Sequence, residues 1–573
     1  MLGLISVGPL LAQGPAISSS AAKAYESGVA AIQSGDVARA QSEFERAVKL
    51  SPNSAEMHLA LGRVLLQRGD AEGAVTQLRA VVGLQPSLAG GYLNLGQALL
   101  AKGLTDEAVA QLRQAIKLTP EDADAHRALA RALSAQQKTP EALAEMKEAV
   151  KLAPNSPEAH DELGSLLAQS QRFTEAEQQF QVALQINPEY QPAHFHIGVV
   201  RLNAGDSAGA RKELTRATEL NPKDGRAFYY LGDACQAAGD KSAAAEAYEQ
   251  AAALMPESAE LQTKLGLALQ RTGDVEKAAA AFRRVIELTP SNPDAHNNLG
   301  LALMQHGEGE AAVKEFQEAV RLRPEDSGYR GNLGIAYMQL SDYDAAVDQL
   351  QQALKISPNE ASLHYDLGLA LKLKDNLPAG IAEMKKAIQL DPKLVDAYYT
   401  LGISKWQQGE FPAAVENLRK AVELKADYAE AYYTLGSVLK QMNQLPEAAQ
   451  ALREAIRLQP LFAGAHTTLA AVLRQMGDTA GAEAETQLGD QLVKQKIGQQ
   501  GATFATNSGK RMLNAGDLDG AISQFRNAVT LSPSYAPAHY QLAVALSRKG
   551  DKAEAAEEFK KAAELDPRLK VSP

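Results

Sequence analysis

The chain is poor in the residues that build disulfide frameworks and large aromatic cores. Its 573 residues include one cysteine, one tryptophan and only 5% aromatic residues. A lone cysteine excludes a disulfide within the chain, and Cys235, at an apolar position, is expected to be a small buried residue. The net charge is −11 and no basic stripe is present, so nucleic acid is not an expected partner.

Long apolar runs and catalytic motifs are missing as well. No stretch is long and apolar enough to cross a bilayer, so no integral membrane segment is predicted. The sequence has no phosphate-binding loop, no zinc-protease helix and no convincing Ser/His/Asp grouping. These absences predict a chain that is not an enzyme, that uses no cofactor and that does not act on a small-molecule substrate.

What the sequence has instead is a strict period. Proline recurs every 34 residues from Pro52 to Pro392, returns at Pro460, and forms a later pair at Pro533 and Pro567. A marker at a fixed spacing indicates one supersecondary unit copied many times. Fourteen repeats occupy residues 21–496, a frame-breaking spacer follows at 497–501, and two further repeats with a short tail fill 502–573.

Each repeat has the pattern of a helical hairpin. Glycine stands at the eighth position in thirteen of the sixteen repeats, and alanine at the twentieth in fifteen. In repeat nine, residues 293–326, apolar residues recur at three- and four-residue spacing, which is the period of amphipathic helices. In eight repeats a Gly-Asp pair lies between the helices, where glycine can end one helix and aspartate can cap the next. The recurring proline then ends the second helix.

These residues carry a resemblance to a known family. Leu299-Gly300, Ala312, Phe316, Ala319 and Pro324 resemble the signature of the tetratricopeptide repeat, and the match extends over residues 21–569. The resemblance implies an all-α, right-handed superhelical solenoid of about sixteen helix-turn-helix repeats, whose first helices line a concave groove. The sequence departs from the family at the fourth position, where histidine replaces the family's tryptophan in eight repeats: His58, His126, His160, His194, His296, His364, His466 and His539.

The stretch from His296 to Gly300 is similar to the repeat arrays of transferases that add N-acetylglucosamine to proteins. In those enzymes the transferase domain follows the repeats, whereas this sequence ends at Pro573, four residues after the last repeat. The resemblance therefore implies a noncatalytic scaffold that binds extended peptides or protein segments. Two alternatives remain: a self-assembling structural repeat protein, and the recognition subunit of a separately encoded glycosyltransferase.

The predicted peptide-binding groove depends on two inner positions of the later repeats. From repeat nine onward the sixth position is always polar, and the fifth is tyrosine in three consecutive repeats. An asparagine side chain can donate and accept hydrogen bonds at once, which suits a clamp on peptide backbone. The alternative interpretation is a solvated helix surface that drifts among duplicated repeats. The predicted groove residues are Asn298, Asn332, Asp366, Thr400, Thr434, Thr468, Tyr365, Tyr399 and Tyr433, with Trp406 close by.

Two other groups of polar residues are interpreted as structural. The eight histidines occupy equivalent positions, so neighbours should lie about one helix-packing distance apart, ~10 Å. The ligands of one zinc ion must converge to bonds of ~2.1 Å, so no metal site is predicted and the histidines are expected to pack in place of aromatics. An acidic spot in repeat five, formed by Glu158, Asp161 and Glu162, is interpreted as solvated surface.

The ends of the array carry two further predictions. Residues 1–20 form an apolar leader with a small-residue end, typical of a signal peptide but without its basic segment. The leader predicts a bacterial protein that is periplasmic or secreted; without export the protein would be cytoplasmic. Near the frame break, Lys494 replaces the expected proline. The second helix of repeat fourteen should therefore continue through Leu492, until Gly498 and Gly501 interrupt it.

Overall fold

The computed structural model describes residues 18–569, and every regular element in that range is an α-helix. The helices form two compact parts, residues 1–291 and residues 292–573. Most of the predicted leader lies outside the described residues. Its last two residues, Ser19 and Ser20, belong to the first helix, α1. The Ser18 hydroxyl accepts a hydrogen bond from the amide of Ala21 and caps that helix.

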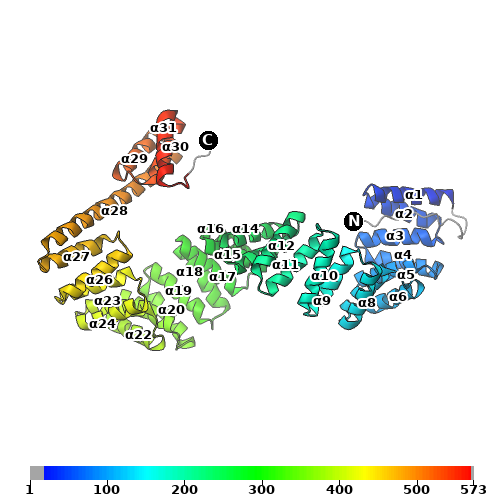
Figure 1. Ribbon diagram of the computed structural model, residues 1–573, viewed down its shortest axis with the longest axis horizontal. Coiled ribbons are helices and arrows are strands. Elements are labelled where there is room, and N and C mark those ends of the chain that lie inside the picture. The colour runs from blue at the N-terminus through cyan, green and yellow to red at the C-terminus, as the bar shows by residue number, and fades with distance from the viewer. Residues whose placement is uncertain (1–17, 570–573) are drawn as a thin grey trace. The chain divides into compact units, whose positions relative to one another are not determined.

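The N-terminal part consists of sixteen helices of nearly equal length (Figure 1). They are α1 (Ser19–Gln33), α2 (Val37–Leu50), α3 (Ala55–Gln67), α4 (Ala71–Leu84), α5 (Ala89–Ala101), α6 (Thr105–Leu118), α7 (Ala123–Ala135), α8 (Thr139–Leu152), α9 (Pro157–Gln169), α10 (Phe173–Ile186), α11 (Gln191–Asn203), α12 (Ser207–Leu220), α13 (Gly225–Ala237), α14 (Lys241–Leu254), α15 (Ala259–Thr272) and α16 (Val275–Leu288).

The C-terminal part continues the same pattern until one long helix changes it. Its helices are α17 (Pro293–His306), α18 (Gly309–Leu322), α19 (Ser327–Gln339), α20 (Tyr343–Ile356), α21 (Ala361–Leu373), α22 (Leu377–Leu390), α23 (Val395–Gln407), α24 (Phe411–Leu424), α25 (Ala429–Gln441), α26 (Leu445–Leu458), α27 (Ala463–Gln475), α28 (Thr479–Asn514), α29 (Leu518–Leu531), α30 (Ala536–Lys549) and α31 (Lys552–Leu565).

The turns that contain a Gly-Asp pair confirm its predicted role, in which glycine ends one helix and aspartate caps the next. Gly35 has a φ of 79°, in the left-handed region that glycine tolerates best, and the carboxylate of Asp36 accepts a 3.0 Å hydrogen bond from the amide of Arg39. Six of the other seven pairs repeat this geometry, whereas Asp551 makes no side-chain cap bond. The chain direction therefore reverses at a position that the sequence already marks.

The proline marker acts through the residue before it. Ser51, which precedes Pro52, leaves helical geometry with φ −141° and ψ 72° and ends α2. The same non-helical geometry recurs at Thr119 before Pro120 and at Arg323 before Pro324. Because the break recurs every 34 residues, it gives all the hairpins nearly the same length.

The eighth-position glycines allow the two helices of a hairpin to approach closely. A Cβ atom on Gly300 would lie 2.7 Å from Cε1 of Phe316, and one on Gly62 would lie 2.6 Å from Cγ of Leu78. Phe316 and Leu78 are fully buried. Glycine is required here because a large side chain of the second helix lies directly over the backbone of the first.

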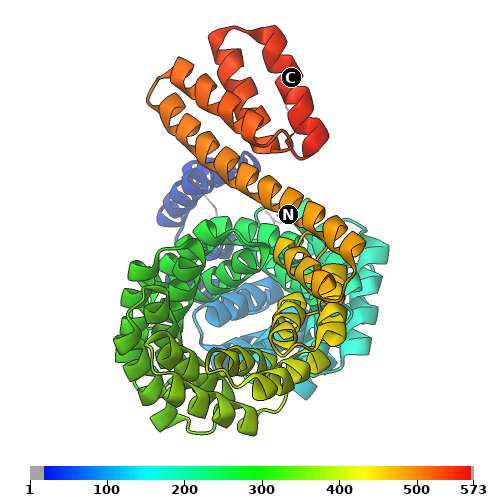
Figure 2. The same cartoon turned by 90° about the vertical axis from the view of Figure 1, so that its left-hand side faces the viewer.

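The predicted interruption near residue 497 is wrong. Helix α28 runs without a break from Thr479 to Asn514, through Gly498 and Gly501 (Figure 2). Glycine within a helix costs only about 1 kcal/mol relative to alanine, and no proline is present to stop the helix. Both glycines face the end of α29, where a Cβ atom on Gly498 would lie 2.4 Å from the carbonyl oxygen of Leu531. The glycines therefore allow close packing, and the division of the chain at 497–501 stays a prediction.

The long helix also exposes apolar side chains. Val493, Ile497 and Phe504 lie within 40° of one another around the helix axis if each residue turns about 100°. Their exposed fractions are 40%, 64% and 71%. Among residues 18–569, no helix combines the length and the apolar character needed to cross a bilayer.

Candidate functional site

The first helices of the repeats form one row, and that row lies on the inside of the curve. In the C-terminal part, α17 contacts α19, α19 contacts α21, α23 contacts α25, α25 contacts α27, and the second half of α28 contacts α30. Within the described residues, no two consecutive second helices make a comparable contact. The row therefore bends toward its first helices, and the green to yellow helices of Figure 2 follow this arc. We call the fifth, sixth, ninth and twelfth positions of α17, α19, α21, α23, α25 and α27 the inner face.

Side chains on neighbouring first helices often meet at a spacing of 35 residues. On the inner face, the amide of Asn332 donates a 2.8 Å hydrogen bond to Oδ1 of Asn297. Nε1 of Trp406 likewise donates to Oε1 of Gln441 at 2.8 Å. Because the repeat has 34 residues, a spacing of 35 places the fifth position of one repeat against the sixth position of the next.

Some of the polar residues predicted at the sixth position are buried or already have partners within the chain. Thr400 and Thr434 are buried, and the Thr434 hydroxyl donates to the carbonyl oxygen of Glu430 in its own helix at 2.8 Å. Asn298, Asn332, Asp366 and Thr468 are partly exposed. The sixth-position residues therefore offer amide and carboxyl groups to a ligand, but the two buried threonine hydroxyls are not accessible.

The predicted tyrosines are half-buried and held in place by neighbouring groups. The rings of Tyr399 and Tyr428 lie 4.9 Å apart between centroids, and those of Tyr433 and Phe462 lie 4.7 Å apart. The hydroxyl of Tyr365 lies 3.5 Å from Oγ1 of Thr400. Because these contacts restrict the ring orientations, the rings would lose little conformational freedom on binding a partner.

Two titratable groups on α21 have unusual surroundings. Burial raises the pKa of Asp366 to about 6, and it lowers the pKa of Lys372. Among the described residues, neither side chain has a hydrogen-bond or ion-pair partner. Asp366 was predicted as a groove residue from its position alone; its isolation depends on the neighbouring helices and was not predicted.

The corresponding face of the N-terminal part is occupied by ion pairs. Glu162 accepts hydrogen bonds from Arg127 at 2.8 Å and from Nε of Arg131 at 2.9 Å. Asp161 bonds Nδ1 of His196 at 2.8 Å, 35 residues away. The acidic spot predicted as solvated surface is therefore largely paired, because its basic partners come from the neighbouring repeats.

The histidines link the second helix of their own hairpin to the end of the preceding repeat, a role that was not predicted from the sequence. In all eight, Nδ1 lies 2.5–2.9 Å from a side-chain oxygen nineteen residues later, which belongs to glutamate in six repeats and to glutamine at Gln77 and Gln179. Nε2 also lies 2.8–3.1 Å from the carbonyl of the proline six residues earlier at His58, His126, His160, His194, His364, His466 and His539. The signal was present in the sequence: every histidine at the fourth position is accompanied by Glu or Gln at the twenty-third.

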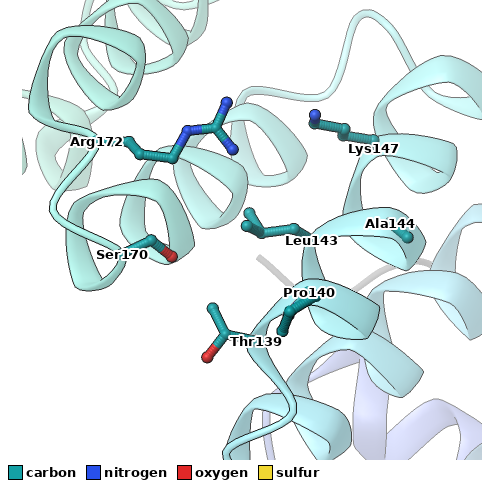
Figure 3. Close-up of a pocket in the computed structure, with 7 residues that line it drawn as sticks. All are labelled: Thr139, Pro140, Leu143, Ala144, Lys147, Ser170 and Arg172. Carbon is teal, nitrogen blue, oxygen red and sulfur yellow. The ribbon is translucent and has the colours of Figure 1, made fainter.

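A separate pocket lies on the second-helix side of the N-terminal part. It has a volume of about 550 Å³ and is lined by residues of α8 and of the turn before α10 (Figure 3). Leu143 and Pro140 provide its apolar wall, and Lys147 and Arg172 lie at its edge. Arg172 is already engaged by Glu175 at 2.7 Å. We therefore regard the inner face as the stronger candidate site.

Paired helices of equal length, packed side by side around a narrow core, define an α-helical repeat solenoid. Models of the tetratricopeptide repeat match residues 25–89, 93–157, 128–190, 197–259, 263–327 and 507–569, and related models of the same repeat match 334–375, 405–443 and 429–462. The chain belongs to the tetratricopeptide repeat family. No curated protein sequence matches it.

Three solved structures are among those similar to this chain. The Cut9-Hcn1 assembly of APC/C is 15% identical, with 79% of this chain and 97% of the other covered and a TM-score of 0.37. MamA from Desulfovibrio magneticus RS-1 is 26% identical, with 30% and 96% covered and a TM-score of 0.28. YrrB, described as having an unusual peptide-binding site, is 22% identical, with 33% and 96% covered and a TM-score of 0.28. Because these TM-scores are low, the family assignment rests on the repeat models.

Proposed function

We propose that the protein is a noncatalytic interaction scaffold whose inner face between α17 and α27 binds extended peptides or protein segments. The observation that carries this proposal is the run of half-buried tyrosines at one position of three consecutive first helices. Tyr365, Tyr399 and Tyr433 offer apolar ring faces in restricted orientations, and amide and carboxyl side chains lie beside them. Such a surface supplies both packing area and hydrogen bonds to an extended chain.

Peptide binding to the full-length chain tests this proposal. The probe is a pool of capped nonapeptides with mixed residues, because nine extended residues span about 30 Å, or roughly three helix-packing distances. We expect the double substitution Tyr399→Ala, Tyr433→Ala to weaken binding about tenfold or more, through the loss of two aromatic contacts. Phe504→Ala is the control, because Phe504 is exposed on α28, a helix that does not contribute to the inner face. Equal affinity in the double variant and the control would contradict the proposal.

The two alternative functions make different predictions. A self-assembling repeat protein would form concentration-dependent oligomers, which analytical ultracentrifugation detects. Lys552, Glu557 and Lys560 lie exposed on α31, which disfavours stacking of copies through that helix. A recognition subunit of a separately encoded glycosyltransferase would copurify with sugar-transfer activity. Neither alternative has an observation in its favour as specific as the tyrosine series.

We also propose that the protein is exported from a bacterial cytoplasm. The support is the apolar leader at residues 1–20, most of which lies outside the described residues. N-terminal sequencing of the protein from its native cells checks this proposal. A mature chain that starts near the beginning of α1 is expected, whereas an intact Met1 in the cytoplasmic fraction would contradict export.

A further inference from the structure

The carboxyl of Asp366 on the inner face takes no part in the pairing between neighbouring first helices. In other repeats a side chain at the fifth position bonds one at the sixth position 35 residues later: Arg127 with Glu162, and Asn297 with Asn332. The residue 35 positions before Asp366 is Gly331, which has no side chain to offer. The carboxyl of Asp366 consequently has no partner from α19.

The other neighbours do not supply a partner either. On α19, Arg330 donates hydrogen bonds to the carbonyl oxygen of Pro324 at 3.1 Å and to Gln349 at 3.3 Å. Lys372 lies six residues further along α21, about 9 Å along the helix axis. On α23, Asp396 is exposed and has the same sign of charge. The Asp366 carboxyl is therefore a half-buried acceptor that the fold leaves open.

The surroundings of this carboxyl suit a long cationic side chain. Leu369 lies one helical turn after Asp366, and Ile335 occupies the equivalent position of α19; both are half-buried. Tyr365 precedes Asp366 on the same helix. Apolar side chains of this kind can cover the aliphatic stem of lysine or arginine, while the carboxylate accepts hydrogen bonds from its charged end.

We propose that Asp366, with Tyr365, Leu369 and Ile335, forms a subsite for one lysine or arginine side chain of the segment bound on the inner face. This inference rests on the proposed function, since it assigns a chemistry to one place on that face. A partly buried carboxylate without a counterion is unfavourable, and a cationic ligand removes that penalty. The subsite therefore selects basic segments over neutral or acidic ones.

Three pools of capped nonapeptides test the subsite with the full-length chain. The pools share mixed flanking residues and differ in the central residue, which is lysine, its neutral near-isostere norleucine, or glutamate. For the unaltered chain at pH 8 we expect the lysine pool to bind about tenfold more tightly than the norleucine pool, and the glutamate pool to bind most weakly. Fluorescence anisotropy of labelled pools measures all three affinities.

The variants separate the charge of Asp366 from its shape. Asp366→Asn should abolish the preference for lysine, so that the lysine and norleucine pools bind with similar affinity. Glu416→Gln removes one negative charge from α24, on the second-helix side, and should keep the preference. In the unaltered chain the preference should shrink as the pH falls from 8 to 5, since the raised pKa of Asp366, about 6, lies within that range. In Asp366→Asn the profile should be flat.

The outcomes distinguish this inference from the proposed function. Equal binding of the lysine and norleucine pools, or a lysine preference that survives Asp366→Asn, overturns the cationic subsite and leaves peptide binding intact. Absence of binding by all three pools overturns both. The pH profile of the unaltered chain needs no variant, so the inference stays testable even if Asp366→Asn folds poorly.

Discussion

The pairing of His194 with Glu213 makes a sharp prediction about local stability and pH. Nδ1 of His194 lies 2.8 Å from the Glu213 carboxylate, and Nε2 lies 3.1 Å from the carbonyl oxygen of Pro188. Both partners are acceptors, so both ring nitrogens must donate, which only the protonated imidazole can do. In accord with this, the hydrogen bond between His194 and Glu213 raises the pKa of His194. The same hydrogen bond lowers the pKa of Glu213.

The perturbation is Glu213→Ala, which leaves a largely buried imidazole without its acceptor. Hydrogen bonds to charged groups contribute about 1.5–3 kcal/mol. Because repeat arrays unfold locally, the loss should appear in α11 and α12 and fade in distant repeats. Amide exchange followed by mass spectrometry at pH 6 should show protection there reduced roughly 10- to 150-fold.

The dependence of this stabilisation on pH follows from the raised pKa of His194 and the lowered pKa of Glu213. The raised pKa of His194 gives a stabilisation that is complete below its ordinary value of 6.5 and is lost as the pH rises through the raised value. The lowered pKa of Glu213 gives a stabilisation that is complete above its ordinary value of 4.5 and is lost as the pH falls through the lowered value. The effect of Glu213→Ala should therefore be largest between these two ordinary values and smaller at pH 8.5.

Glu213→Gln is the matched control, because glutamine already occupies this position beside His58 and His160. The glutamine amide can turn so that its NH2 group, rather than its oxygen, faces Nδ1 and donates to a neutral imidazole. This variant should therefore lose little protection and should show little dependence on pH. Arg201, which also contacts Glu213 at 3.2 Å, keeps Glu177 at 2.7 Å in both variants. Equal losses in the alanine and glutamine variants, or a loss in the alanine variant that does not change with pH, would refute the reasoning.

Three further predictions concern packing, the long helix and the inner face. A Cβ atom on Gly334 would lie 2.7 Å from Cγ of Leu350, so Gly334→Leu should cost roughly 1–3 kcal/mol and increase amide exchange around α19–α21; a uniform loss of protection across all repeats would contradict local packing. Gln495→Pro should cost about 3 kcal/mol and create a protease-sensitive site within α28, while α17–α27 stay protected; loss of protection throughout α17–α27 would show that the array depends on that helix. The double substitution Asn298→Ala, Asn332→Ala should weaken binding of the nonapeptide pool about tenfold, measured by anisotropy and by Trp406 emission, and unchanged affinity would remove these amides from the site.

Much of the fold was predictable because its determinants are local and repeated. A left-handed glycine before a capping aspartate, as at Gly35 and Asp36, acts within a few residues, and so does a proline that ends a helix. Repetition makes such signals reliable, since the same residues mark the same turn in many repeats. The long α28 was not predicted, because Gly498 and Gly501 have the same weak helix propensity whether they break a helix or pack against one.

The candidate site was predictable only in outline. The sequence placed Asn332, Asp366 and Tyr399 on one helix face, which follows from the position of each residue within its own repeat. The partner of each side chain depends on the neighbouring helix, and the spacing of 35 residues that sets those partners is a property of how hairpins stack. For that reason the burial of Thr400 and Thr434 and the isolation of Asp366 were not apparent in the sequence.

By itself, then, the sequence determined the repeat, its helical hairpins and the family, because those depend on contacts within one 34-residue unit. The tertiary structure alone decided which polar groups of neighbouring repeats satisfy one another, from the bonds of Arg127 to Glu162 to the unpaired carboxyl opposite Gly331. The physical reason is that a hydrogen bond needs two groups within about 3 Å, and the second group here comes from another helix.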